Sequence, residues 1–233
     1  MSDSALGRLL GALVAPGATF RSIALRPTWA APFALLVLIS LVAGYLVLQR
    51  IDYEQFMRQQ NERTGQMTAE QVTERAAQMH NLAPVLALGQ GLVAAPAIYL
   101  IIALLFWVGF RLVGSEMTYK ASLATSLHAL LPGAVGGLLS IPVILSHASF
   151  TVAESRGGGF LASNLGALAP EGTGPVLRAL LGSMDLFTAW VVILLVIGFG
   201  AVAKVSRAAT IGVVATLVVV ALALKVALAA FTG

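Results

Sequence analysis

Long uninterrupted apolar runs dominate the chain, and two of them close it with only a short basic turn between them. No residue is charged from Leu186 to Ala203 or from Ala208 to Leu224. Each stretch is close to the ~20 apolar residues that an α-helix needs to cross a ~30 Å hydrocarbon core. The residues that separate them, 204–207, include Lys204 and Arg207. The pattern predicts a transmembrane helical hairpin.

Three further apolar runs precede the hairpin, so we expect five spans. A polar arm at 51–81 separates the first span from the second, and a Gly-rich loop at 147–183 separates the third from the fourth. The short apolar pieces of that loop cannot cross a bilayer. The predicted fold class is all-α, a polytopic membrane protein whose membrane domain covers residues 30–233. The expected spans are about 30–48, 87–110, 121–145, 185–203 and 208–231.

The first 29 residues differ from the spans because their apolar positions recur at helical spacing. Within residues 4–15, four leucines lie on one helical stripe, and Arg8 lies off it. The segment is too short to cross, so residues 1–29 are predicted to form an amphipathic interfacial segment.

The polar arm carries its own helix signals. Thr68 and Gln71 have the spacing of a capping box, and a narrow apolar stripe follows them. We expect a solvated helical arm that lies on the membrane, and a partner-binding helix is the alternative.

Small residues recur at every fourth position of the third predicted span. Such a ridge lets another helix approach closely, so we assign a helix-packing role to Ala129, Gly133 and Gly137. A membrane-protein partner or a second copy of the chain could pack on the same ridge. Pro132 cannot donate to the carbonyl of His128, so this span is expected to kink near its middle.

The distance of a polar residue from the end of its predicted span indicates how deep it lies in the membrane. His128 follows Lys120 by eight positions, ~12 Å along a helix, and Thr216 reaches a similar depth. An ionisable residue at this depth is a functional candidate, so His128 and Thr216 form a candidate intramembrane polar site. The alternative is a neutral imidazole that bonds a neighbouring helix.

Two opposite charges flank the closing hairpin. Antiparallel pairing about the turn at 204–207 places Asp185 and Lys225 at the same depth, so they form a candidate ion pair. Alternatively, each side chain reaches the headgroups by itself.

Composition narrows the function classes. The chain is 58% hydrophobic and 10% charged, whereas about 25% of a soluble domain is charged. The lipid bilayer is therefore its main partner. The basic residues are dispersed, which argues against nucleic-acid binding. The chain lacks cysteine and has no zinc-hydrolase or serine-hydrolase motif, so we expect no enzyme, metal or cofactor.

Lys and Arg are equally numerous on the two sides of the membrane, but their positions differ. Those on the side of the N-terminus cluster in short turns, whereas many on the other side lie in longer segments among acidic residues. Short loops determine orientation. We therefore expect a protein of the cell inner membrane with a cytoplasmic N-terminus and an external C-terminus.

Three stretches share an order and spacing that is characteristic of one family. They are APGATFRSIALRPTWAAPFALL, LVGSEMTYKASLATSLHALLP and MDLFTAWVVILLVIGFGAVAKVSRAAT. Together they resemble the Yip1 family of small polytopic membrane proteins. The resemblance implies five spans and a cytoplasmic N-terminus. Its eukaryotic members are linked to Rab GTPases and vesicle traffic, and this chain is similar to the shorter bacterial form.

Two functions fit these observations. The first is a non-enzymatic membrane protein that organises or shapes the bilayer or acts as an adaptor subunit. The second is a permease or channel component for a small solute. A solvated cavity that reaches His128 favours transport, and a dry, packed bundle favours organisation.

Overall fold

The computed structural model describes residues 4–156, 160–170 and 172–232, and helices account for most of them. Within these ranges there is no β-strand, and only two isolated bridges pair extended residues. The helices are α1 (Ala5–Val14), α2 (Pro16–Leu25), α3 (Ala30–Leu48), α4 (Tyr53–Thr64), α5 (Ala69–Gly89), α6 (Ala95–Leu112), α7 (Tyr119–Ala129), α8 (Leu131–Ser146), α9 (Val152–Arg156), α10 (Pro175–Leu181), α11 (Leu186–Val202) and α12 (Arg207–Thr232), with a π-helix η1 (Gln90–Ala94) and a 3-10 helix η2 (Leu165–Leu168).

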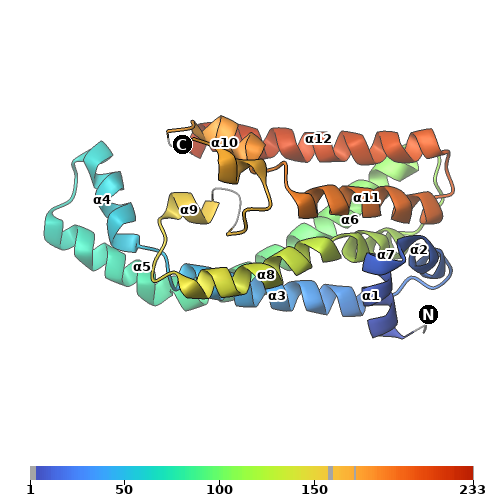
Figure 1. Ribbon diagram of the computed structural model, residues 1–233, viewed down its shortest axis with the longest axis horizontal. Coiled ribbons are helices and arrows are strands. Elements are labelled where there is room, and N and C mark those ends of the chain that lie inside the picture. The colour runs from blue at the N-terminus through green and yellow to red at the C-terminus, as the bar shows by residue number, and fades with distance from the viewer. Residues whose placement is uncertain (1–3, 157–159, 171, 233) are drawn as a thin grey trace.

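Four helical segments of the described chain are long and apolar enough to cross a membrane: Ala30–Leu48, Ala69–Leu112, Tyr119–Ser146 and Arg207–Phe231. Helix α11 is apolar too and has 17 residues, about 26 Å of helix. It runs beside α12 and completes the bundle (Figure 1). The predicted all-α, polytopic membrane fold is therefore confirmed.

The two ends of this bundle differ (Figure 1). We call the end that holds α1, α2 and the α11–α12 turn the proximal end. The opposite end, where α4, α9 and α10 lie, is the distal end. The described chain begins at the proximal end and ends at the distal end (Figure 1).

At the proximal end α1 stands across the long axis of the bundle (Figure 1). The Ser4 hydroxyl caps it by accepting a hydrogen bond from Gly7 N at 3.1 Å. Leu6, Leu10 and Val14 form its exposed face, whereas Arg8 and Ala12 are buried against the bundle. The apolar face of α1 therefore points outward and its basic residue points into the protein.

Helix α2 anchors this region in the main core. Pro16 occupies its first turn, where a missing N–H costs nothing. Phe20 and Ile23 are fully buried in the cluster that also contains Phe110 and Phe199, whose rings stack at 4.6 Å.

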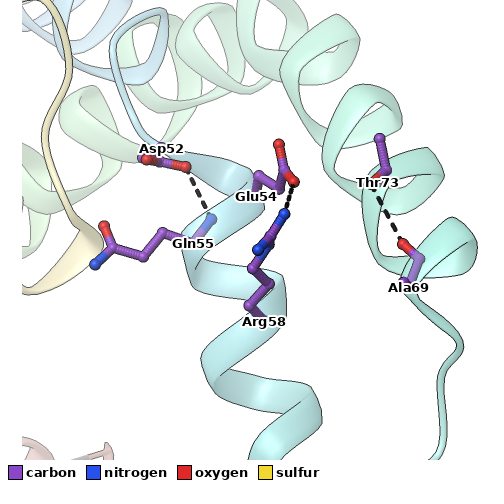
Figure 2. Close-up of polar contacts among 6 residues, drawn as sticks. All are labelled: Asp52, Glu54, Gln55, Arg58, Ala69 and Thr73. Carbon is purple, nitrogen blue, oxygen red and sulfur yellow. Dashed lines mark hydrogen bonds and ion pairs between the residues drawn. The ribbon is translucent and has the colours of Figure 1, made fainter.

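The polar arm is a helical hairpin at the distal end. Asp52 caps α4, and the left-handed Gly65, with φ of 62°, ends it. The predicted capping box of Thr68 and Gln71 is present at the start of α5. Helix α5 then continues through η1 into α6, so the arm and the second span form one helical segment. Figure 2 shows the local polar contacts of this arm, including the Glu54–Arg58 ion pair.

The third predicted span is broken where a kink is expected. Helix α7 ends at Ala129 and α8 begins at Leu131, so only Leu130 separates them. Pro132 lies in the first turn of α8, where it lacks a donor for the carbonyl of His128. The interruption lies at the position where the sequence predicts a kink.

Candidate functional site: two cavities at the broken span

Two cavities lie on either side of the break between α7 and α8. The proximal cavity has a volume of about 610 Å³, and the distal cavity has a volume of about 530 Å³. His128, the penultimate residue of α7, lines the proximal cavity, and Leu130 lines the distal one. Two positions of the chain thus separate the walls of the two cavities.

The distal cavity lies between α8, α11 and α12 and under the Gly-rich loop. Its polar lining groups come from each of these elements. They are Ser140, Ser163, Asp185, Thr188 and Lys225.

Asp185 serves as the N-cap of α11. One carboxylate oxygen, Oδ1, accepts hydrogen bonds from the backbone N–H groups of Phe187 at 2.8 Å and Thr188 at 3.1 Å. The other oxygen, Oδ2, accepts from the Ser163 hydroxyl. The carboxylate therefore starts the helix and ties the Gly-rich loop to it.

The predicted ion pair between Asp185 and Lys225 is not formed. Both residues line the distal cavity, but no contact within 4 Å joins their charged groups in the described part of the chain. Instead, the Asp185 oxygens accept hydrogen bonds from the start of α11 and from Ser163. Equal depth along two helices does not fix the directions in which their side chains point.

The predicted ridge of small residues packs only in part. Ala129 is buried, and a Cβ added to Gly137 would lie 3.0 Å from Ile39 Cγ2 of α3. A Cβ added to Gly133, by contrast, would meet nothing within 4 Å, and this residue lines the distal cavity. The break at Leu130 interrupts the helix, so residues before and after it do not share one face. The packing role predicted for Gly133 is therefore wrong.

Other glycines make the closest helix contacts. A Cβ on Gly91 of η1 would lie 2.7 Å from the Cα of Leu41 on α3. A Cβ on Gly198 of α11 would lie 2.8 Å from Thr125 Cγ2 and 2.9 Å from Phe20 Cε1. Gly91 continues a series of small residues at every fourth position, Ala83, Ala87, Gly91 and Ala95, so the spacing that marks the third span also marks this glycine. Gly198 has Leu194 and Val202 at these positions, and spacing does not reveal it.

His128 is buried at the end of α7. Its Nδ1 lies 2.8 Å from the Ala124 carbonyl oxygen, and since a carbonyl only accepts, Nδ1 is the protonated nitrogen. The partner is one turn back on the same helix rather than on a neighbouring helix. Thr216 is exposed on α12 and lines neither cavity. The structure therefore does not bring His128 and Thr216 into one polar site.

Arg8 is the lining residue that the sequence reasoning did not identify. It is only 5% exposed, and its Nη1 donates to the Arg26 carbonyl oxygen at 2.7 Å and to Thr28 Oγ1 at 2.8 Å. Both acceptors lie in the connection between α2 and α3. Its position off the leucine stripe of α1 is the sequence signal that marks it as facing the protein.

The two cavities differ in the chemistry of their lining groups. Among the residues with described placement, no three His, Asp or Glu side chains gather in a way that could hold a metal ion. The proximal cavity offers basic side chains, and the distal cavity offers hydroxyl groups with one carboxylate and one ammonium group.

Comparison with known proteins gives one family. The model of the Yip1 domain matches residues 10–228, which is nearly the whole chain. No curated protein and no solved structure matches it.

Proposed function

The chain belongs to the Yip1 family, and from this premise we propose that it is a non-enzymatic, multi-pass protein of the cell inner membrane that organises or shapes the bilayer or acts as an adaptor subunit. The observation that carries this proposal is the outward apolar face of α1. Leu6, Leu10 and Val14 recur at every fourth position and are all exposed, while α1 crosses the bundle axis at the proximal end.

A helix in this position occupies area in one leaflet only. Amphipathic helices at an interface insert their apolar face to the level of the upper acyl chains. Helices α1 and α2 lie together at the proximal end (Figure 1), so the exposed apolar face of α1 adds area there beyond that of the crossing helices. Such asymmetry couples the protein to membrane curvature, and it also offers a partner a surface at one leaflet.

A matched pair of variants tests the role of this face. One replaces Leu6, Leu10 and Val14 with alanine, and the control replaces Val220, Leu224 and Leu228. Both sets contain two leucines and one valine at every fourth position and are exposed, but the control set lies on the crossing helix α12.

The measurement is the partition of fluorescent protein, inserted in one orientation, between a giant vesicle and a narrow tube pulled from it. We expect the α1 variant to shift toward an even partition, whereas the control keeps the uneven partition of the parent protein. Even partition of the parent protein, or equal shifts in both variants, contradicts membrane shaping through α1.

The proposed orientation places α1 in the cytoplasmic leaflet. The short basic turns at the proximal end support it, because positive charges in short loops stay in the cytoplasm. A reporter that is active only outside the cytoplasm, inserted after Gly65 in the polar arm, should be active. Activity of a reporter that works only in the cytoplasm, inserted at the same position, would contradict the proposed orientation.

A permease component for a small solute is the second candidate. The observation in its favour is that two cavities approach one broken helix from opposite ends, as in transporters with discontinuous helices. His128 lines one of them, which is the feature expected of a transport path. Two results together would favour this function over membrane shaping. The His128→Asn variant would reduce the flux of a solute into proteoliposomes, and the parent protein would partition evenly between vesicle and tube.

A further inference from the structure

We propose that the proximal cavity is a binding site for the phosphate of an anionic phospholipid headgroup. The cavity is enclosed by α1, the connection from α2 to α3, the start of α3, and α7. This inference concerns lipid recognition and does not depend on the proposed function.

The first argument is charge. Every titratable side chain among the described lining residues is basic, and they come from three separate parts of the chain. They are Arg8, Arg26, Lys120 and His128. Arg8, Arg26 and Lys120 are the cationic groups among them, and convergence of cationic groups from distant segments is the arrangement that phosphate binding requires.

The second argument is the way in which Arg8 is held. Its guanidinium is buried, and hydrogen bonds to the Arg26 carbonyl and to Thr28 Oγ1 fix it relative to the start of α3. A guanidinium that is already positioned loses little side-chain entropy when it binds an anion, and its planar fork matches phosphate oxygens. Arg26 and Lys120 are exposed and line the same cavity.

The third argument selects a lipid over a soluble phosphate. Trp29 lines the cavity and packs edge-on against Phe33 of α3, with ring centroids 5.8 Å apart. Tryptophan marks the headgroup level of a membrane protein. The remaining wall includes Ala30, Ala31 and Pro32, the first residues of a helix that crosses the hydrocarbon. A ligand in this cavity thus meets cationic groups and an apolar path at the same time, as a phospholipid does.

The test is a titration of fluorescent phosphatidylglycerol into the purified full chain in neutral detergent, followed by anisotropy. The double variant Arg26→Gln/Lys120→Gln removes two exposed charges and leaves the buried Arg8 in place. The control, Lys204→Gln/Arg207→Gln, removes one lysine and one arginine that are exposed at the same end but outside the cavity. Size-exclusion profiles establish that all proteins are folded.

We expect the double variant to bind phosphatidylglycerol at least about tenfold more weakly, since it lacks two cationic hydrogen-bond donors for the phosphate. The control variant should retain the affinity of the parent protein. Unlabelled phosphatidylglycerol should displace the probe, whereas phosphatidylcholine should not, and inorganic phosphate at matched ionic strength should not.

Three results overturn the proposal. Equal losses in the double variant and the control mean that the probe responds to general surface charge. Displacement by inorganic phosphate as effective as by the lipid assigns the cavity to soluble anions. Equal displacement by phosphatidylcholine means that net negative charge is not recognised.

Discussion

Helices α7 and α12 show opposite relations between hydrophobicity and position. Among the four candidate spans of the described chain, the one that contains α12 has the highest mean hydropathy and the one that contains α7 has the lowest. Yet nine consecutive residues of α7, Ala121 to Ala129, are all buried, whereas α12 lies at the edge of the bundle and is mostly exposed. The candidate span with the highest mean hydropathy therefore lies at the edge of the bundle.

The reason is that lipid replaces water around the bundle. An apolar side chain gains little by leaving acyl chains for a protein interior, so hydrophobicity does not drive a helix to the centre. Small residues favour the centre of the bundle because they let helices approach closely. Residues with hydroxyl groups favour it because the protein offers them hydrogen-bond acceptors that lipid lacks. Ser122 and Thr125 on α7 illustrate this, since their hydroxyl groups donate to the carbonyls of Ala103 and Ala121 at 2.7 and 2.8 Å.

The largest effect is expected where another helix meets α7. Gly198→Leu inserts a side chain where even a Cβ would lie 2.8 Å from Thr125 and 2.9 Å from Phe20. Overpacking of this kind should cost about 3 kcal/mol or more of unfolding free energy, measured by SDS titration from a mild detergent. Gly200→Leu is the control, because a Cβ there would meet nothing within 4 Å. Equal losses would mean that α11 does not pack on α7 through this face.

A direct comparison of the two helices uses the same substitution in each. Leu127 of α7 is fully buried, and Leu224 of α12 is 61% exposed. Leu127→Ala should cost about 1–3 kcal/mol, mainly through the cavity that it leaves, since transfer to lipid contributes little. Leu224→Ala should change stability by less than about 0.5 kcal/mol. Similar costs at both positions would remove the distinction between a central and a peripheral helix.

The hydroxyl groups of α7 allow a finer test. Ser122 bonds across to α6, but Ser126, one turn later and equally buried, has no hydrogen-bond partner within the described residues. Ser122→Ala should cost about 0.5–1 kcal/mol, the usual contribution of such a bond in a membrane protein. Ser126→Ala should be neutral or slightly stabilising, because it removes an unsatisfied polar group. The reverse order would show that Ser126 has a polar partner in the membrane.

The smallest effect lies outside both helices, in the distal loop. Thr151 N and Thr151 Oγ1 donate to the Glu154 carboxylate at 2.7 and 2.9 Å, and these bonds hold the pKa of Glu154 below its ordinary value. A carboxylate whose pKa is lowered in the folded state stabilises that state at pH values above its ordinary pKa. This stabilisation is lost as the pH falls through the pKa of the folded state. Acidification should therefore loosen α9 slightly, seen as faster hydrogen exchange at 152–156.

Glu154→Gln is the control for that measurement, because the amide does not titrate. Its exchange at 152–156 should show no step in the acidic range, and the unfolding of the bundle should be the same for both proteins. If the Glu154→Gln variant still showed faster exchange at acidic pH, a titratable group other than Glu154 would be responsible for the change.

Structural features that depend on residues close to one another in the sequence were predictable. The crossing helices follow from apolar runs long enough for the hydrocarbon, and the break at Leu130 follows from the missing N–H of Pro132. The Thr68–Gln71 capping box likewise needs only a spacing of three. Each of these depends on residues within a few turns of one another, so a single sequence contains the necessary information.

The tertiary structure alone decided which faces meet. Gly133, Thr216 and the Asp185–Lys225 pair were chosen from spacing and depth along helices, and rotation about each helix axis placed them elsewhere. Arg8 and Gly198 became important because α1 and α2 cross the bundle and pack on α7 and α11. The sequence by itself determined the membrane class, the crossing helices and their breaks, since these follow from local composition. Helix order and rotation depend on contacts between distant segments in a solvent as apolar as the side chains, and hydrophobicity therefore could not specify them.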